Sequence, residues 1–437
     1  MPPQTRRTVL TTAGSLGVLT IAGCLGDEQD TTEHSDDTID DESDDQSPGD
    51  DIPEDDEDDD TAEEDEYTDE LSHLPGEAIE DFEELDSWYA MIGQGELSAT
   101  EDSVYAGAQS AWIEANEDTE YAGVYREFFD PLDLHDKNLS LAVRFTGREM
   151  FDLTVQVLAP NSRNYLQYRR VLTGPTDRWV RVDLGANLQR TQPDLYDVRE
   201  IRVIGRRRRD TEGSISFAID DLRAVERPEN GAVILLFDGM YESQHDVALD
   251  ILEEYDAAGV AAIIPEAVDG DGRLTLDQMR TMQDAGWDMI SRPRVGARFM
   301  HEFTAEEQEG MIRRAQTYLR NRGFEDGAKH FFTPRNIISP EGMDLVREYH
   351  EQAFRYGGSP NALPLTDPHN LGHFSASNGD DARSFIDLAT EYKQLAVPLI
   401  GDIDEDGMSE ESFRDLLEYI DERDVEIITA TDLLTEY

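Results

Sequence analysis

The chain has 437 residues, of which 98 are Asp or Glu and 37 are Lys or Arg, giving a formal net charge of −61. A surface this negative repels DNA, RNA and anionic lipid, which excludes nucleic-acid binding. At about 150 residues for each domain, the length predicts two or three domains.

The cations are almost all arginine, because lysine occurs only at Lys137, Lys329 and Lys393. This excess of carboxylates with little lysine resembles the composition of halophilic proteins. In molar salt, a Debye length of about 3 Å screens the repulsion among the carboxylates. The composition therefore predicts a protein that folds in high salt.

Residues 1–23 are typical of an export signal. Arg6 and Arg7 precede a short apolar run, which resembles a twin-arginine signal, and the run ends in a lipobox-like Ala-Gly-Cys at Cys24. Cleavage before Cys24, the only cysteine, would free it to carry a lipid. We expect an exported protein held by this lipid on the outer face of the cytoplasmic membrane. The alternative is an uncleaved N-terminus with a free thiol.

Residues 24–76 are dominated by Asp and Glu and have almost no apolar side chains. Such a segment cannot bury a core, and its like charges extend it. It predicts a disordered stalk.

Residues 77–228 contain many short runs of strand-forming residues between turns, several of them alternating apolar and polar side chains. This pattern favours an antiparallel β-sandwich. The runs are 104–106, 139–143, 153–158, 179–184, 201–204 and 214–219.

The order of these runs resembles a jelly roll of the carbohydrate-binding-module type. Such modules often hold a structural calcium between the first and last strands, which implies Glu83 with Asp220 or Asp221 as oxygen ligands. The alternative is that all three are ordinary surface acids.

A glycan would stack on exposed aromatic rings of this domain, although each ring could equally serve packing. The candidates are Trp88, Tyr89, Trp112, Tyr165 and Tyr168. Residues 206–209 are four consecutive arginines, which could contact an acidic glycan or the acidic stalk, or form a solvated turn.

Residues 229–437 alternate apolar strands with amphipathic helices, which predicts a parallel (β/α) barrel or a doubly wound sheet. Thr275 is expected to cap one helix, and Thr304 with Glu307 to form a capping box for another. The expected strands are 233–237, 260–265, 287–291, 330–333, 353–356, 373–375, 395–400 and 425–429.

Motifs in this half resemble the polysaccharide deacetylase (NodB-like) family, whose fold is a distorted (β/α) barrel. Ile234–Tyr241 reads Ile-Leu-Leu-Phe-Asp-Gly-Met-Tyr, similar to the family's strand ending in Phe-Asp-Asp-Gly-Tyr. Asp284–Ser291 resembles the approach to its Ser-His-Thr motif, and Phe331–Pro334 the strand before its Arg-Pro-Tyr motif. Val397–Ile403 lies where the family has a catalytic His, and residues 427–429 resemble its closing strand.

The resemblance implies a divalent metal on one Asp and two His, with a second Asp as base and a late His as acid. The base position is Asp238. The metal Asp falls on Gly239, the metal His positions on Arg292 and Gly296, and the acid on Gly401. We therefore expect a degenerate site, in which the Arg292 guanidinium pairs with Asp238 in place of the metal.

The remaining candidates for a zinc site are His369 and His373 together with Asp367. The Pro and Gly residues among them indicate a loop. Three functions stay open at this point. They are a non-catalytic surface lipoprotein that binds polysaccharide or another cell-surface glycan, an active metal-dependent esterase that removes acetyl groups, and a structural surface protein. Zinc is expected only for the esterase.

Overall fold

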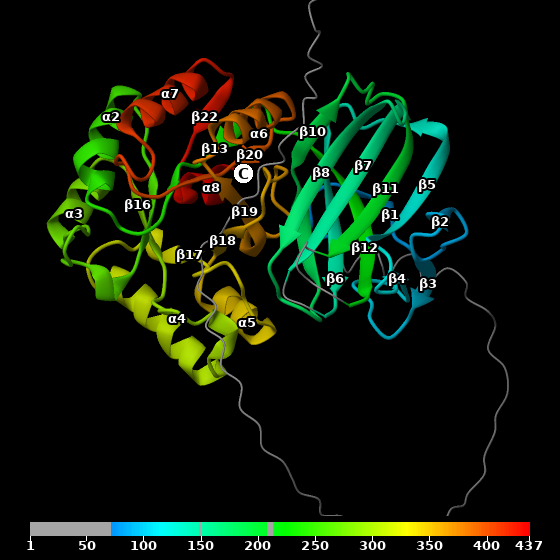
Figure 1. The fold of residues 1–437 in the computed structure, drawn as a ribbon, viewed down its shortest axis with the longest axis horizontal. Coiled ribbons are helices and arrows are strands. Elements are labelled where there is room, and N and C mark those ends of the chain that lie inside the picture. Colours follow the sequence, from blue (N-terminus) through cyan, green and yellow to red (C-terminus); the bar gives the residue numbers. More distant parts are fainter. Residues whose placement is uncertain (1–70, 148–149, 208–212) are drawn as a thin grey trace, which may run out of the picture. The chain divides into compact units, whose positions relative to one another are not determined.

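The computed structural model describes residues 71–147, 150–207 and 213–437. Its fold is a β-sandwich followed by a closed barrel of parallel strands, which confirms the fold class predicted from the sequence (Figure 1). Within the described ranges, no helix combines the length and the apolar character needed to cross a membrane. The export signal, Cys24 and most of the predicted stalk lie outside these ranges.

The first sheet of the sandwich has the strand order β3-β4-β12-β6-β9, with β1 paired to β12. All of these pairs are antiparallel. The strands are β1 (Glu77–Glu80), β3 (Glu96–Thr100), β4 (Ser110–Ala115), β6 (Lys137–Phe145), β9 (Val180–Leu184) and β12 (Ile215–Glu226).

The second sheet has the order β10-β8-β7-β11-β5-β2, and it too is antiparallel. Alternate residues of both sheets meet in one apolar core that includes Phe145, Phe151 and Phe217. The strands are β2 (Trp88–Ala90), β5 (Tyr121–Leu132), β7 (Phe151–Asn161), β8 (Asn164–Leu172), β10 (Ala186–Arg190) and β11 (Val198–Arg207).

One strand expected from the sequence is absent from the described fold. Residues 104–106 form a loop rather than a strand. The backbone N–H groups of Tyr105 and Ala106 donate to the Asp220 carboxylate instead of to a neighbouring strand. The Asp220 carboxylate thus takes the place of the backbone carbonyls of a neighbouring strand. The apolar run alone could not predict this substitution.

The barrel closes through seven parallel strands in the order β14-β15-β16-β17-β18-β19-β21. Apolar side chains fill its interior, among them Ile290, Phe332 and Phe354. The strands are β14 (Leu236–Phe237), β15 (Val260–Ile263), β16 (Asp288–Ser291), β17 (His330–Phe332), β18 (Gln352–Tyr356), β19 (Leu371–Ser375) and β21 (Pro398–Ile400).

A separate three-stranded sheet of β20 (Leu395–Ala396), β13 (Gly231–Val233) and β22 (Val425–Ile427) lies beside the barrel. The expected strands 233–237 and 395–400 are therefore each divided between two sheets. The last expected strand belongs to this small sheet and not to the barrel.

Helices on the outside of the barrel connect the strands (Figure 1). Thr275 caps α3 and Thr304 forms a capping box with Glu307 at the start of α4, as predicted, and Thr275 also forms a capping box, with Gln278. The helical segment after β14 begins as a π-helix, η1 (Gln244–Leu249), and continues as α2 (Asp250–Glu254). The other helices are α3 (Leu276–Asp284), α4 (Ala305–Arg320), α5 (Pro340–Tyr349), α6 (Gly379–Glu391), α7 (Glu410–Asp421) and α8 (Ala430–Glu436).

Polar contacts join β6, β8 and β10 to barrel loops. The fully buried Arg170 donates to Asn361 Oδ1 at 2.7 Å, and Ala186 N donates to Gln394 Oε1 at 2.8 Å. Asn138 Nδ2 donates to the Leu363 carbonyl at 2.8 Å. The sandwich and the barrel therefore share a buried polar boundary rather than only a linker.

Candidate functional site

The C-terminal ends of the barrel strands place Asp238 after β14 and Arg292 after β16. Arg292 Nε lies 2.8 Å from Asp238 Oδ1, and Arg292 Nη2 donates to Oδ2 at 3.2 Å. The Nε contact is an ion pair without hydrogen-bond geometry, so the pair has one directed hydrogen bond. Both side chains are largely buried, with 17% and 24% exposure for Arg292 and Asp238. The ion pair predicted from the sequence is confirmed.

Asp238 is also fixed by its own turn, because Gly239 N donates to its Oδ1 at 2.7 Å. The Arg292 guanidinium lies 5.7 Å from the centre of the Phe332 ring, which supports its stem and its charge. The carboxylate is thus held by two donors and has one cation beside it.

The family's metal does not fit these residues. Gly239 has a φ of +93°, and a Cβ built there would lie 2.2 Å from Cε2 of Tyr241. Arg273 covers the same ring at 4.4 Å and donates to the Gly239 carbonyl, which holds the ring in place. A carboxylate ligand has no room at this position, and the Arg292 charge repels a cation. Gly296 and Gly401 are exposed and have no side chain to bind a metal.

His369 and His373 do not converge on a shared site. His369 Nε2 donates to the His350 carbonyl at 2.8 Å, while Asp367 pairs with Arg347. His373 Nε2 lies 3.1 Å from Asn336 Oδ1, and burial lowers its pKa to about 3. Among the described residues, no group of three or more His, Cys, Asp or Glu side chains is placed to hold a metal ion.

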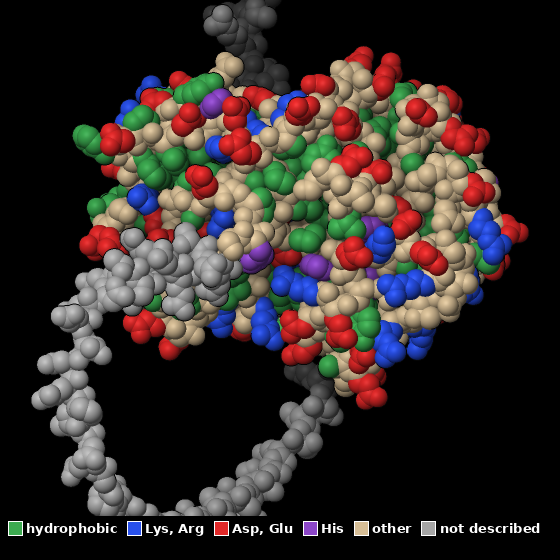
Figure 2. All heavy atoms as spheres, turned by 180° about the vertical axis from the view of Figure 1, so that it is seen from behind, with side chains coloured by type: hydrophobic (Ala, Val, Ile, Leu, Met, Phe, Trp, Pro, Cys, Tyr) green, Lys and Arg blue, Asp and Glu red, His purple; other side chains and the backbone are tan. Residues whose placement is uncertain are grey.

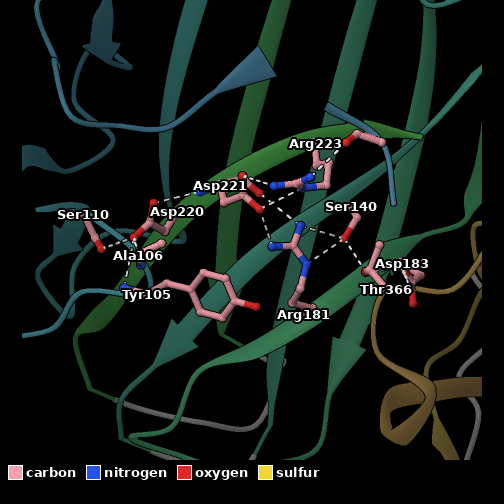
Figure 3. A network of polar contacts seen from close by, with 11 residues as sticks. Tyr105, Ala106, Ser110, Ser140, Arg181, Asp183, Asp220, Asp221, Arg223 and Thr366 are labelled. Carbon is pink, nitrogen blue, oxygen red and sulfur yellow. Dashed lines mark hydrogen bonds and ion pairs between the residues drawn. The ribbon is translucent and has the colours of Figure 1, made fainter. Parts of the chain in front are cut away.

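The sandwich acids Asp220 and Asp221 follow one another in a bulge of β12 but face different partners (Figure 3). Asp220 accepts from Ser110 Oγ at 2.5 Å and from two loop N–H groups, and burial raises its pKa to about 7. Asp221 forms ion pairs with Arg181 at 2.5 Å and Arg223 at 3.1 Å. These two arginines supply the positive charge that calcium would bring.

Glu83, the third calcium candidate, accepts from the N–H groups of Ala108 and Gln109. Glu83 and Asp220 thus both contact the segment of residues 105–110, whereas Asp221 faces arginines on β9 and β12. Calcium binding by Glu83 with Asp220 stays a prediction.

The network around Asp221 continues into the barrel (Figure 3). Arg181 donates to Ser140 Oγ at 3.0 Å, and Ser140 is 2.6 Å from the Thr366 hydroxyl. Thr366 in turn donates to Asp183, whose pKa burial raises to about 6. The bulge of β12 and the barrel loop are therefore joined through buried polar side chains.

Of the candidate stacking rings, Trp88 and Tyr168 are buried in the sandwich core. Trp112 lies on the outer face of β4, and its indole donates to Glu114. Tyr89 is 53% exposed on the second sheet, and Tyr165 is part of that sheet too. Within the arginine run, Arg206 stacks on Tyr121 and Arg207 binds backbone carbonyls, while residues 208 and 209 lie outside the described ranges.

A row of polar and aromatic side chains crosses the outer face of this second sheet. Strand register places its members side by side, one on each of the six strands, in the spatial order Tyr89, Tyr125, Arg202, Gln156, Gln167 and Leu188. On β7, β8 and β11 the residues on either side of the row are buried in the core, for example Val155 and Val157 beside Gln156. The row was missed from the sequence, although alternation along residues 151–172 could have shown which side chains share a face.

The row is organised by contacts between its members. The Tyr89 and Tyr125 rings are 5.7 Å apart at a 38° angle. Gln156 Nε2 donates to Gln167 Oε1 at 2.9 Å, and Gln167 Nε2 donates to Asn187 at 3.3 Å. A shallow hollow of about 470 Å³ lined by Tyr89, Leu97 and Gln109 lies at the β2 end.

Comparison with solved structures finds separate similarities to two kinds of domain. The Xyl-CE4 domain of a multidomain xylanase from the hindgut metagenome of Trinervitermes trinervoides is 14% identical, with a TM-score of 0.36, and covers 48% of this chain and 91% of its own. A Streptococcus pyogenes deacetylase solved with acetate is 17% identical over 43% of this chain and 69% of its own, with a TM-score of 0.30.

A xylan-binding domain of carbohydrate-binding module family 22 is 19% identical, with a TM-score of 0.25, and covers 35% of this chain and 95% of its own. These solved structures therefore include a deacetylase-type domain and a carbohydrate-binding module. No protein-family model and no curated protein matches the chain.

Proposed function

We propose that this protein is a cell-surface glycan-binding protein whose barrel has lost metal-dependent deacetylation. The row from Tyr89 to Leu188 across the second sheet carries the proposal. At about 4.8 Å between strands, its five steps span about 24 Å, enough for an oligosaccharide to lie across the sheet.

The chemistry of this row suits sugar rings. A tyrosine ring offers a flat apolar face to the C–H side of a sugar and a hydroxyl to its edge. Glutamine amides both donate and accept, as sugar hydroxyls do, and Arg202 adds a planar set of donors. The hydrogen bond between Gln156 and Gln167 and the ion pair of Arg202 with Glu200 fix these side chains before a ligand arrives, which reduces the entropy lost on binding.

The residues at the barrel mouth support the proposed loss of hydrolysis. The position of the metal Asp is filled by the Tyr241 ring, and the expected histidine positions are Arg292 and Gly296. Of the family's five groups, only the base position Asp238 keeps its residue, and it is neutralised by an ion pair.

The test is a glycan array in molar salt, followed by calorimetry with the best ligand and the variants Tyr125→Ala and Gln156→Ala. Each variant should weaken binding by about tenfold or more, as is common for well-placed interface side chains. Trp112→Ala on the other sheet is the matched aromatic control and should leave affinity unchanged. Full affinity in Tyr125→Ala and Gln156→Ala would exclude this face, and acetate released from an acetylated oligosaccharide would favour the esterase.

We also propose that Cys24 carries the membrane anchor. The support is the order of Arg6, Arg7, the apolar run and the small residues before Cys24. Cys24→Ala should leave the protein unprocessed or release it into the medium, as seen by fractionating cells and blotting for the chain. Unchanged membrane retention of the mature form would contradict the anchor.

A further inference from the structure

Arginines gather on two loops at the mouth of the barrel. Arg292, Arg294 and Arg298 follow β16, and Arg335 follows β17, so all four are at the C-terminal face of the strands. Arg294, Arg298 and Arg335 are exposed. In a chain with 98 acidic and 37 basic residues, such a group is unexpected from composition.

These arginines are largely without acidic partners. Arg280, Arg313 and Arg414, on the outer helices, each pair with a nearby carboxylate. By contrast, Arg294 and Arg335 have no ion pair with any residue that the structure describes. Their charge is therefore available to a ligand.

Aromatic rings fix two of the guanidinium groups. Arg335 lies 4.5 Å from the Phe299 ring centre, and Arg298 lies 3.7 Å from that of Phe303. A guanidinium stacked on a ring still directs its N–H edge outward, and that edge matches the two oxygens of a carboxylate or sulfate. The contact of Arg335 with Phe299 also joins the two loops into one surface.

The backbone that presents Arg335 is unusual. Arg335 and Asn336 both have positive φ, at 56° and 69°. Two consecutive non-glycine residues in this region are strained, and such strain persists where the surroundings impose it, often at a binding site. Here Asn336 is held by its contacts with Tyr356 N and His373 Nε2, so the turn that exposes Arg335 is imposed by its neighbours.

We propose that the barrel mouth binds the anionic groups of an acidic polysaccharide, carboxylates or sulfates, through Arg294 and Arg335. This deepens the proposed glycan binding and rests on it, with the sheet face contacting sugar rings and the mouth contacting charge. Arg292 forms an ion pair with Asp238 and lies at the edge of the proposed site, where it does not contact the ligand.

The experiment measures binding of the full chain to polygalacturonate and to the same polymer after methyl esterification, at one fixed salt concentration. Dextran sulfate and dextran form the second pair and separate sulfate from carboxylate recognition. The charged polymer of at least one pair should bind more tightly than its neutral partner. Arg294→Gln with Arg335→Gln should weaken that binding by about tenfold or more, as expected for the loss of charge-assisted hydrogen bonds.

The matched control is Arg320→Gln with Arg322→Gln, at the end of α4 on the opposite face of the barrel. It changes the net charge equally and also removes a stacked arginine, since Arg322 lies 3.5 Å from the Tyr318 ring centre. Equal loss in both double variants, or equal binding of charged and neutral polymers, would overturn the proposal. Binding of a neutral glycan that depends on Tyr125 but ignores charge would overturn it while preserving the proposed function, whereas no glycan binding at all would remove both.

Discussion

Asp238 and Arg292 show how an arginine can give a carboxylate at a strand end a positive neighbour. A guanidinium can neither activate water nor polarise a carbonyl as a divalent ion does. This pairing was predictable from the sequence, because both residues follow expected strands.

Removing Arg292 alone should lower the free energy of unfolding more than removing Arg292 and the Asp238 charge together. Arg292→Met keeps the contact with Phe332 but leaves Asp238 partly buried without its cation, so we expect a loss of about 1–2 kcal/mol in unfolding free energy. Asp238→Asn combined with Arg292→Met should recover most of this loss, since Asn keeps an acceptor for Gly239 N. Urea unfolding of the three proteins checks the order. A double variant less stable than the single one would contradict it.

His350 is a second residue whose environment makes a prediction. Its ring is buried against Phe331, neither ring nitrogen has a hydrogen-bond partner among the residues that the structure describes, and burial lowers its pKa to about 3. Because the unfolded imidazole takes up a proton below about pH 6.5 and the folded one does not, stability falls as the pH drops through this range.

His350→Phe should therefore raise the unfolding free energy by about 1 kcal/mol at pH 7.5, because it removes unpaired polar atoms. At pH 5 the gain in unfolding free energy should be about 2 kcal/mol larger than at pH 7.5. Denaturant titrations of both proteins at the two pH values measure it. The other buried histidines and acids are common to both proteins, so the difference isolates His350. A gain independent of pH would contradict the assignment.

At the scale of elements, the turn between β9 and β10 fits closely against a barrel loop. A Cβ at Gly185 would lie 1.8 Å from the Pro360 carbonyl oxygen. Because this neighbour is backbone, the clash cannot be relieved by a rotamer change. Close packing of the two parts thus depends on a residue without a side chain.

Gly185→Ala should destabilise the protein by about 2–3 kcal/mol through overpacking. Gly310→Ala is the control, because Gly310 is exposed in α4 and a Cβ there meets no atom within 4 Å. That substitution should stabilise the helix by up to about 1 kcal/mol. Thermal unfolding should move in opposite directions for the two. A neutral Gly185→Ala would mean that the loop is not packed as described.

The elements also show what sequence patterns could and could not predict. The N-cap at Thr275 and the capping box at Thr304 are local, so the sequence was sufficient to place them. The sequence could not predict that the expected strand 233–237 is divided between β13 and β14. A continuous apolar run shows that the segment is buried, but it does not show which sheet each half joins. The row of side chains across the second sheet was missed for a similar reason: Tyr125, Gln156 and Arg202 are neighbours only through strand register.

For the whole molecule, charge is the dominant feature. Acidic side chains are spread over the face shown in Figure 2, with Lys and Arg in smaller groups between them. At a net charge of −61, dilute salt leaves the compact state subject to strong self-repulsion.

The melting temperature should fall as salt is lowered from molar to millimolar concentration, because the Debye length grows from about 3 Å to 30 Å or more. Scanning calorimetry in a series of KCl concentrations measures the change. The control replaces KCl by an uncharged osmolyte at equal osmolality. Because an uncharged solute does not screen the carboxylates, it should not restore the melting temperature measured in molar KCl. A melting temperature that is constant across the series would contradict the prediction.

The packing of Tyr241 against Gly239 has a consequence for protein engineering. Placing an aspartate at position 239 would require the Tyr241 ring to move, and Arg273 packs over that ring. A metal site of the deacetylase type would also need two histidines and an acid in place of Arg292, Gly296 and Gly401. No single substitution can therefore build such a site here, because a neighbouring side chain already fills the space for its first ligand.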